Sequence, residues 1–153
     1  MCFFVCLAVP KRSLENWNTI SHGFDVLDVT GWSIGKATRG NGDRDNAFLI
    51  TAGGCSCFIS DTSHRFGKLG LNEFESLIRS IWRQTPRVAL LIHYASGDIS
   101  KEEVIRKDKR TVLLNEVAGQ LNRLEHDVRF IIANRVPVKG EFNGQRKFVA
   151  LEC

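Results

Sequence analysis

The sequence lacks a long apolar run and a recognisable export signal. A membrane-spanning helix needs roughly 20 consecutive apolar residues, whereas the apolar start of this chain is confined to residues 1–10. No basic segment precedes that start and no small-residue cleavage site follows it, so it does not have the pattern of a signal peptide. We therefore expect a cytoplasmic protein with reduced cysteines and no membrane partner.

A strong charge imbalance and a phosphate-binding motif are also missing. The chain has 21 basic and 17 acidic residues, and its net charge of +4 is mild. The basic residues between 101 and 110 are interrupted by acidic ones, which argues against nucleic acid as a partner. No segment matches a Walker or dinucleotide-binding pattern. The partner predicted by the sequence is thus an unidentified small molecule or protein.

What the sequence does contain is the composition of one globular domain over residues 1–153. It is 43% hydrophobic and 25% charged, close to the average for folded proteins. A chain of this length buries enough surface to fold without disulfides or metal. We see no linker, internal repeat or low-complexity segment.

Short apolar runs alternate with helical periodicity, which predicts an α/β domain of the mixed α+β kind. We expect a mixed central sheet with about three helices packed on it and a C-terminal β-hairpin around Asn143-Gly144. The predicted strands are 2–9, 24–29, 47–60 with a turn at Gly53-Gly54, 88–94, 128–133, 136–142 and 145–151. The predicted helices follow Ser13, begin at an Asn72 cap, and run from a Ser100 cap with a bend near 109–110 to residue 125.

The segment 31–46 is rich in glycine and polar residues, which is typical of a loop. A loop of this length is often functional. Trp32, at its entrance, could stack on a ligand, and Arg39 and Arg44 could hold a phosphate or carboxylate. These three residues are the ligand-binding candidates.

Cys55 and Cys57, in the tripeptide Cys-Ser-Cys, are the most informative chemical feature. Side chains alternate along a strand, so the two cysteines would share one face with Cα atoms about 6.6 Å apart. At that spacing both thiolates can bend toward one tetrahedral ion. Zinc is the expected metal.

The third and fourth ligands of such a site must come from elsewhere in the chain. Cys2 and Cys6 would be about 13 Å apart in a regular strand, so only one of them can join the site. We favour Cys2, because a residue at a chain end adjusts more freely. His93, His22 or His64 would supply the fourth ligand.

The same residues would also allow thiol catalysis. His93 and Asn134 lie near the ends of two predicted strands, and ligand crevices form outside the carboxyl ends of parallel strands. Cys2 would then be the nucleophile, His93 its base and Asn134 the group that orients the base. Alternatively, removal of Met1 would make the amino group of Cys2 the base for its own thiol.

A Met-Cys start that leads into a buried strand is similar to the start of the glutamine amidotransferases of the N-terminal nucleophile type. The segment Thr38-Arg39-Gly40-Asn41-Gly42-Asp43 looks like their Arg-Gly-Pro-Asp segment. The chain departs from the family pattern, because Phe3 replaces the usual glycine and the proline is missing. The likeness covers about a tenth of the chain, which is too little to assign it to that family.

Two further interpretations stand beside the cysteine-dependent site. Free cysteine behaves as a small hydrophobic residue, and Cys2, Cys6, Cys55 and Cys57 all lie in apolar runs, so packing alone would explain them. The competing function is a non-enzymatic binding module that uses segment 31–46. Whether Cys2 lies near Cys55 and Cys57 is the observation that bears most directly on these alternatives.

Overall fold

A computed structural model describes residues 2–10, 23–40, 44–59, 70–85, 87–123 and 125–133. Its centre is a six-stranded sheet in the order β2-β3-β1-β4-β6-β5. The bounds of these strands are β1 Cys2–Pro10, β2 Asp25–Asp28, β3 Asp45–Thr51, β4 Ala89–Ala95, β5 Asp108–Leu113 and β6 Val128–Ala133.

The sheet is mixed, as the sequence predicted. The central strand β1 pairs antiparallel with both β3 and β4, and β2 and β6 extend the sheet antiparallel on either side. The remaining edge strand, β5, runs parallel to β6, and the chain between them passes through helix α4 (Val117–Asn122). The predicted hairpin at 136–151 lies outside the described residues, as does the predicted helix after Ser13.

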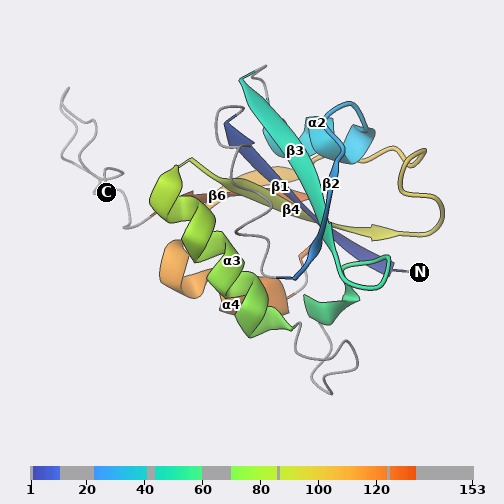
Figure 1. Cartoon of the computed structure of the whole chain (residues 1–153). Coiled ribbons are helices and arrows are strands. Elements are labelled where there is room, and N and C mark those ends of the chain that lie inside the picture. Colours follow the sequence, from blue (N-terminus) through green and yellow to red (C-terminus); the bar gives the residue numbers. More distant parts are fainter. Residues whose placement is uncertain are drawn as a thin grey trace, which may run out of the picture.

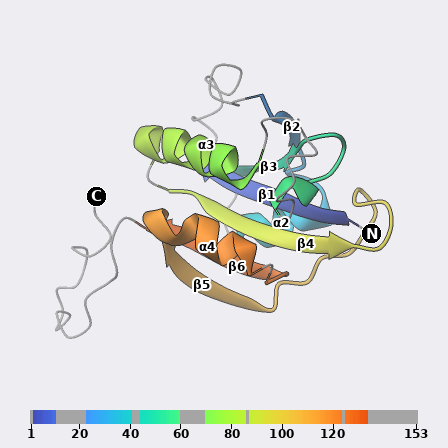
Figure 2. The same ribbon diagram turned by 90° about the horizontal axis from the view of Figure 1, so that it is seen from below.

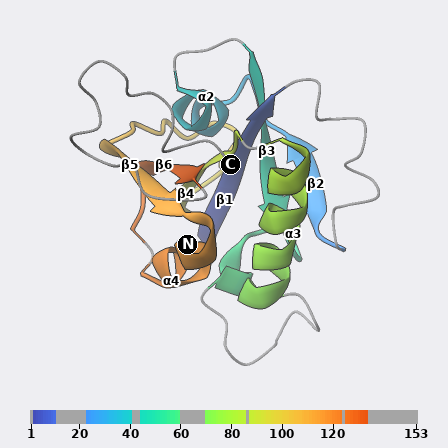
Figure 3. The same cartoon turned by 90° about the vertical axis from the view of Figure 1, so that its left-hand side faces the viewer.

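Helices cover the two faces of the sheet unequally. Helix α3 (Leu71–Gln84) and α4 pack on one face and contact each other (Figures 1 and 2), whereas α2 (Ser33–Arg39) lies on the other side of β1 from α3 (Figure 3). The described part of the chain therefore has three α-helices, in agreement with the predicted number.

The alternation of side chains along β1 explains why its sequence is apolar throughout. Val5, Leu7 and Val9 belong to the core beneath α3 and α4. Phe4 and Cys6 point to the opposite face and belong to a second core with Ile34 of α2. A strand buried on both faces has no position for a polar side chain.

Helix α3 follows the predicted amphipathic pattern but begins earlier than expected. Its buried residues Phe74, Leu77, Ile78 and Ile81 recur at helical spacing. The N-cap is Gly70 instead of Asn72, and the Gly70 N–H donates to Glu73 Oε1 at 2.9 Å.

The prediction that 31–46 is one loop was wrong, because α2 and the start of β3 lie within it. The loop was predicted from the glycine content of this segment. A Cβ on Gly35 would lie 1.9 Å from the Val29 carbonyl oxygen, so glycine serves close packing of the helix here. The first residue of β3, Asp45, is buried and paired with Arg87.

The predicted helix beginning at Ser100 was also wrong. Residues 102–107 have no regular secondary structure, and β5 follows them. Helix α4 starts only at Val117, after the short 3-10 helix η3 (Leu114–Glu116). The expected core residues Val117 and Leu121 are buried, so this part of the pattern was correct.

Candidate functional site

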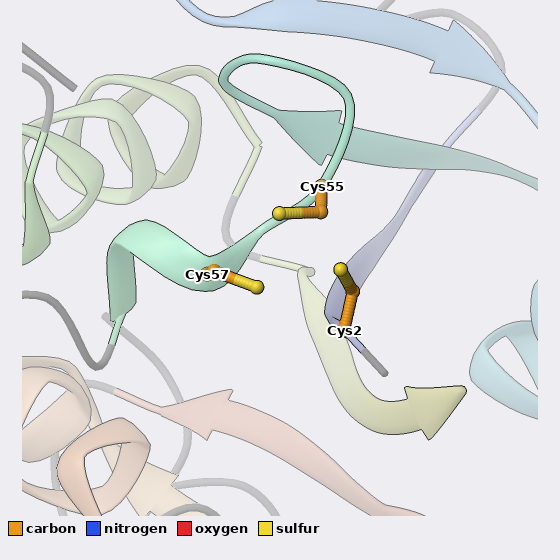
Figure 4. Close-up of side chains that lie close together, drawn as sticks. All are labelled: Cys2, Cys55 and Cys57. Carbon is orange, nitrogen blue, oxygen red and sulfur yellow. The ribbon is translucent and has the colours of Figure 1, made fainter. Parts of the chain in front are cut away.

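Three cysteines from separate elements meet at one end of the central strand. Cys2 opens β1, Cys55 follows the turn after β3, and Cys57 opens the 3-10 helix η2 (Cys57–Ile59). Figure 4 shows their side chains directed toward a common space. The three sulfur atoms all lie within 4.8 Å of one another, and all three side chains are partly buried. The predicted group Cys2, Cys55 and Cys57 is thus present.

A two-residue turn brings Cys55 back beside the end of β3. Gly53 and Gly54 have φ values of 71° and 94°, which favour glycine at both central positions of a tight hairpin turn. The turn is closed by an isolated bridge in which the Ala52 N–H donates to the Cys55 carbonyl at 2.8 Å. Cys55 is therefore held by backbone geometry.

Ser56, between the two cysteines, fixes this segment to β1. Its backbone N–H donates to the Phe3 carbonyl at 2.8 Å. Its buried hydroxyl accepts from the Val5 N–H at 2.9 Å and donates to the Ile50 carbonyl, so it bridges β1 and β3. Because Phe3 is next to Cys2, the same contacts that anchor Ser56 also set the distance between Cys2 and its two partners.

The environment of Cys55 disfavours its thiolate in the absence of a cation. Burial, together with the neighbouring Cys57 and Cys2 side chains, raises its pKa to about 12. Burial likewise raises the pKa of Cys6 to about 12, but Cys6 is fully buried in the second core and does not belong to the group of three. The preference for Cys2 over Cys6 is consistent with this placement.

His93 contacts two carboxylates and does not belong to the group of three cysteines. Its Nδ1 lies 2.6 Å from Asp127 Oδ1 and its Nε2 lies 2.8 Å from Glu102 Oε1. Both contacts are hydrogen bonds when each ring nitrogen carries a proton, since an ionised carboxylate only accepts. This arrangement leaves neither nitrogen for a metal ion or a thiol, and it does not support the expected role of His93 as ligand or base.

The carboxylates around His93 are themselves positioned by the backbone. Glu102 accepts from the N–H groups of Ser96 and Gly97, each at 3.2 Å. The hydrogen bond from His93, followed by these backbone bonds, lowers the pKa of Glu102. The Asp127 N–H donates to the Ile92 carbonyl at 2.7 Å. The network thus ties β4 to the chain that follows it, through Glu102, and to the segment just before β6, through Asp127.

The other predicted site residues are not brought to the cysteines by the described structure. Asn134, His22 and His64 lie outside the described residues, as does Met1. The reason for pairing Asn134 with His93 was a parallel arrangement of their strands. Strands β4 and β6 are antiparallel, so their carboxyl ends point in opposite directions and lie at opposite ends of the strands.

The three predicted ligand-binding residues lie in and around α2. Trp32 precedes the helix and packs, partly buried, against the second core. Arg39 ends the helix and is partly buried, whereas Arg44 is exposed just before β3. Trp32 therefore packs at the edge of the second core.

No protein-family model matches this chain, and neither a curated protein nor a solved structure shows significant similarity to it. Among the described helices, none combines the length and the hydrophobicity of a membrane-spanning helix.

Sequence reasoning missed Ser56, Glu102 and Asp127. Ser56 could have been suspected, since a serine flanked by Cys55 and Cys57 in an apolar run needs partners for its hydroxyl. Glu102 falls within the helix predicted from Ser100, and nothing in the sequence around Asp127 indicates a contact with His93. These two contacts depend on the strand order, which the sequence does not reveal.

Proposed function

We propose that Cys2, Cys55 and Cys57 bind a soft metal ion, with zinc as the expected ion. The observation that carries this proposal is the convergence of three sulfur atoms within 4.8 Å of one another from three separate elements. Sulfur ligands of one tetrahedral zinc ion lie roughly 3.8 Å apart, given a Zn–S bond of about 2.3 Å. Side-chain rotation that moves the sulfur atoms by about an ångström would reach that spacing.

The environment of Cys55 argues against this cysteine as a reactive thiol and suits it to a metal site. A nucleophilic cysteine has a lowered pKa, set by a nearby cation or a helix N-terminus. The pKa of Cys55 is instead raised to about 12, first by burial and then by its cysteine neighbours. A bound cation would remove this penalty, because it replaces the proton on each sulfur and neutralises the thiolates together.

Metal binding also explains the hydrogen bonds of Ser56 better than packing of the cysteines does. Cys6 is buried in the second core, and Cys2 and Cys55 pack against the edge of that core, but apolar packing alone does not require the hydrogen bonds of Ser56. The hydroxyl and backbone bonds of Ser56 fix the direction of the chain on both sides of it. Fixed ligand direction is what a metal site requires.

The fourth coordination position is open within the described residues, where no histidine or carboxylate joins the three sulfurs. Structural zinc sites have four protein ligands, whereas catalytic ones keep a position for water or substrate. A site of three thiolates also suits Cu(I). His22 and His64 remain predicted fourth ligands, and their variants are part of the test.

The test is native mass spectrometry and metal analysis of the tag-free protein and its cysteine variants. We expect one zinc ion per chain, lost in Cys2→Ser, Cys55→Ser and Cys57→Ser. Cys6→Ala is the matched control, because Cys6 is buried outside the group and this variant should keep its metal. Loss of zinc in His22→Ala or His64→Ala would identify the fourth ligand. A metal-free wild type after incubation with zinc, with fast alkylation of one thiol, would instead favour thiol chemistry.

A further inference from the structure

A second site lies between α2 and the chain that leads to β5. It is a pocket of about 360 Å³, lined by Ser33, Lys36, Ala37, Gly40, Val104 and Arg106. None of the cysteines lines it. Its volume is at the small end of the range for ligand pockets, which suits a small molecule better than a polymer.

The wall of this pocket is fixed by Ser33. The Ser33 hydroxyl accepts a hydrogen bond from the Val104 N–H at 2.7 Å and donates to the Val104 carbonyl at 3.4 Å. These bonds hold the extended segment before β5 against α2, although the two are far apart in sequence. Lys36 and Arg106 are consequently placed around the same space.

Positive charge at the pocket is not neutralised within the described structure. Lys36 and Arg106 are exposed and form no ion pair with any described residue, and no carboxylate lines the pocket. Charges of one sign that converge without a partner form a binding site for the opposite charge.

Arg129 adds a third cation behind Gly40. Its Nε donates to the Thr38 carbonyl at 2.8 Å and its Nη2 to the Arg39 carbonyl at 3.4 Å. A Cβ on Gly40 would lie 3.1 Å from the Arg129 Cζ, so the missing side chain lets the guanidinium approach the pocket wall. Burial first, and then the charge of Arg106, lower the pKa of Arg129.

We propose that this pocket binds a small molecule through its phosphate group. A phosphomonoester carries close to two negative charges at neutral pH, which matches the two unpaired cations of the pocket, Lys36 and Arg106, better than a single carboxylate would. Asp45, the acid whose charge acts on Arg129, is already paired with Arg87. Guanidinium and ammonium groups are the side chains that proteins use for phosphate.

The test is a titration of the ¹⁵N-labelled full chain with inorganic phosphate at constant ionic strength, followed by amide chemical shifts. We expect saturable shifts in residues 33–40 and 104–106. Arg106→Gln and Lys36→Gln should each weaken binding about tenfold, because a hydrogen bond to a charged group is lost. Arg83→Gln, which removes an exposed cation on α3, on the other side of β1 from α2, is the matched control and should not change the affinity.

Four results would overturn the proposal. The first is a linear, unsaturable shift over all basic residues, and the second is an equal loss of affinity in Arg83→Gln. The third is acetate binding as tightly as phosphate. Glycerol 3-phosphate is the second probe: an affinity equal to or tighter than that of inorganic phosphate supports an ester ligand, and a weaker one contradicts it.

Discussion

Replacement of Ser56 by alanine should destabilise the protein and weaken its metal site together. Ser56 is fully buried, and so are Val5 and Ile50, whose backbone groups it bridges. Removing the hydroxyl leaves a buried N–H and a buried C=O without this partner, and each such group costs about 1–3 kcal/mol. Since the strands can relax partly, we expect the free energy of unfolding to fall by about 3 kcal/mol. Domains are stable by only about 5–15 kcal/mol, so the effect would be large.

The assay is urea unfolding of metal-free wild type and Ser56→Ala, followed by zinc titration of both. Ser76→Ala is the control, because the Ser76 hydroxyl also bonds to a carbonyl but lies on the exposed face of α3. That variant should stay within about 0.5 kcal/mol of wild type. If Ser56→Ala were as stable as Ser76→Ala and bound zinc as tightly as wild type, the anchoring role of Ser56 would be refuted.

Two further predictions concern α2 and the His93 network. Gly35→Ala should lower the free energy of unfolding by about 3 kcal/mol or more, because its Cβ would overlap the Val29 carbonyl, while Gly119→Ala in open space should stabilise by up to about 1 kcal/mol. Thermal unfolding of both variants checks this. The pKa of Glu102 is lowered by His93, so its stabilising effect is present above the unfolded-state pKa of about 4.3 and is lost as the pH falls through the folded-state value. The stability difference between wild type and Glu102→Gln should therefore shrink below about pH 5, and a constant difference would contradict the assignment.

Most strands of this fold could be predicted because their burial leaves a clear trace in the sequence, whereas the largely exposed β5 falls within the helix predicted from Ser100 to residue 125. The apolar run of β1 reflects a strand covered on both faces, and the spacing of Phe74, Leu77, Ile78 and Ile81 reflects a helix with one buried face. These local signals were sufficient for the mixed sheet with about three helices. The strand order was not accessible, because it depends on which distant segments pair.

The elements that were predicted wrongly are those in which tertiary contacts outweigh the local sequence pattern. Gly35 suggested a loop, yet it permits the close approach of α2 to Val29. Ser100 and Glu103 suggested a helix cap, yet the neighbouring Glu102 bonds to His93 and Val104 to Ser33. A segment bound at both of these positions to other parts of the fold cannot close into a helix.

The cysteine group was predicted from a geometry that is only partly present. The expected regular strand through Cys55 and Cys57 is instead a tight turn followed by a 3-10 helix. The two residues still meet Cys2, because Ser56 fastens the segment to β1. The residue spacing therefore identified cysteines that come together, whereas the anchoring contacts became visible only in three dimensions.

The central claim is that Cys2, Cys55 and Cys57 bind one metal ion together. X-ray absorption spectroscopy at the zinc edge of the zinc-loaded protein tests it most directly, because it counts the sulfur atoms bound to the metal. The account predicts three sulfur ligands at about 2.3 Å, falling to two in Cys55→Ser if that variant retains any zinc, and remaining three in Cys6→Ala. A zinc ion bound by one sulfur or none in the wild type would contradict it.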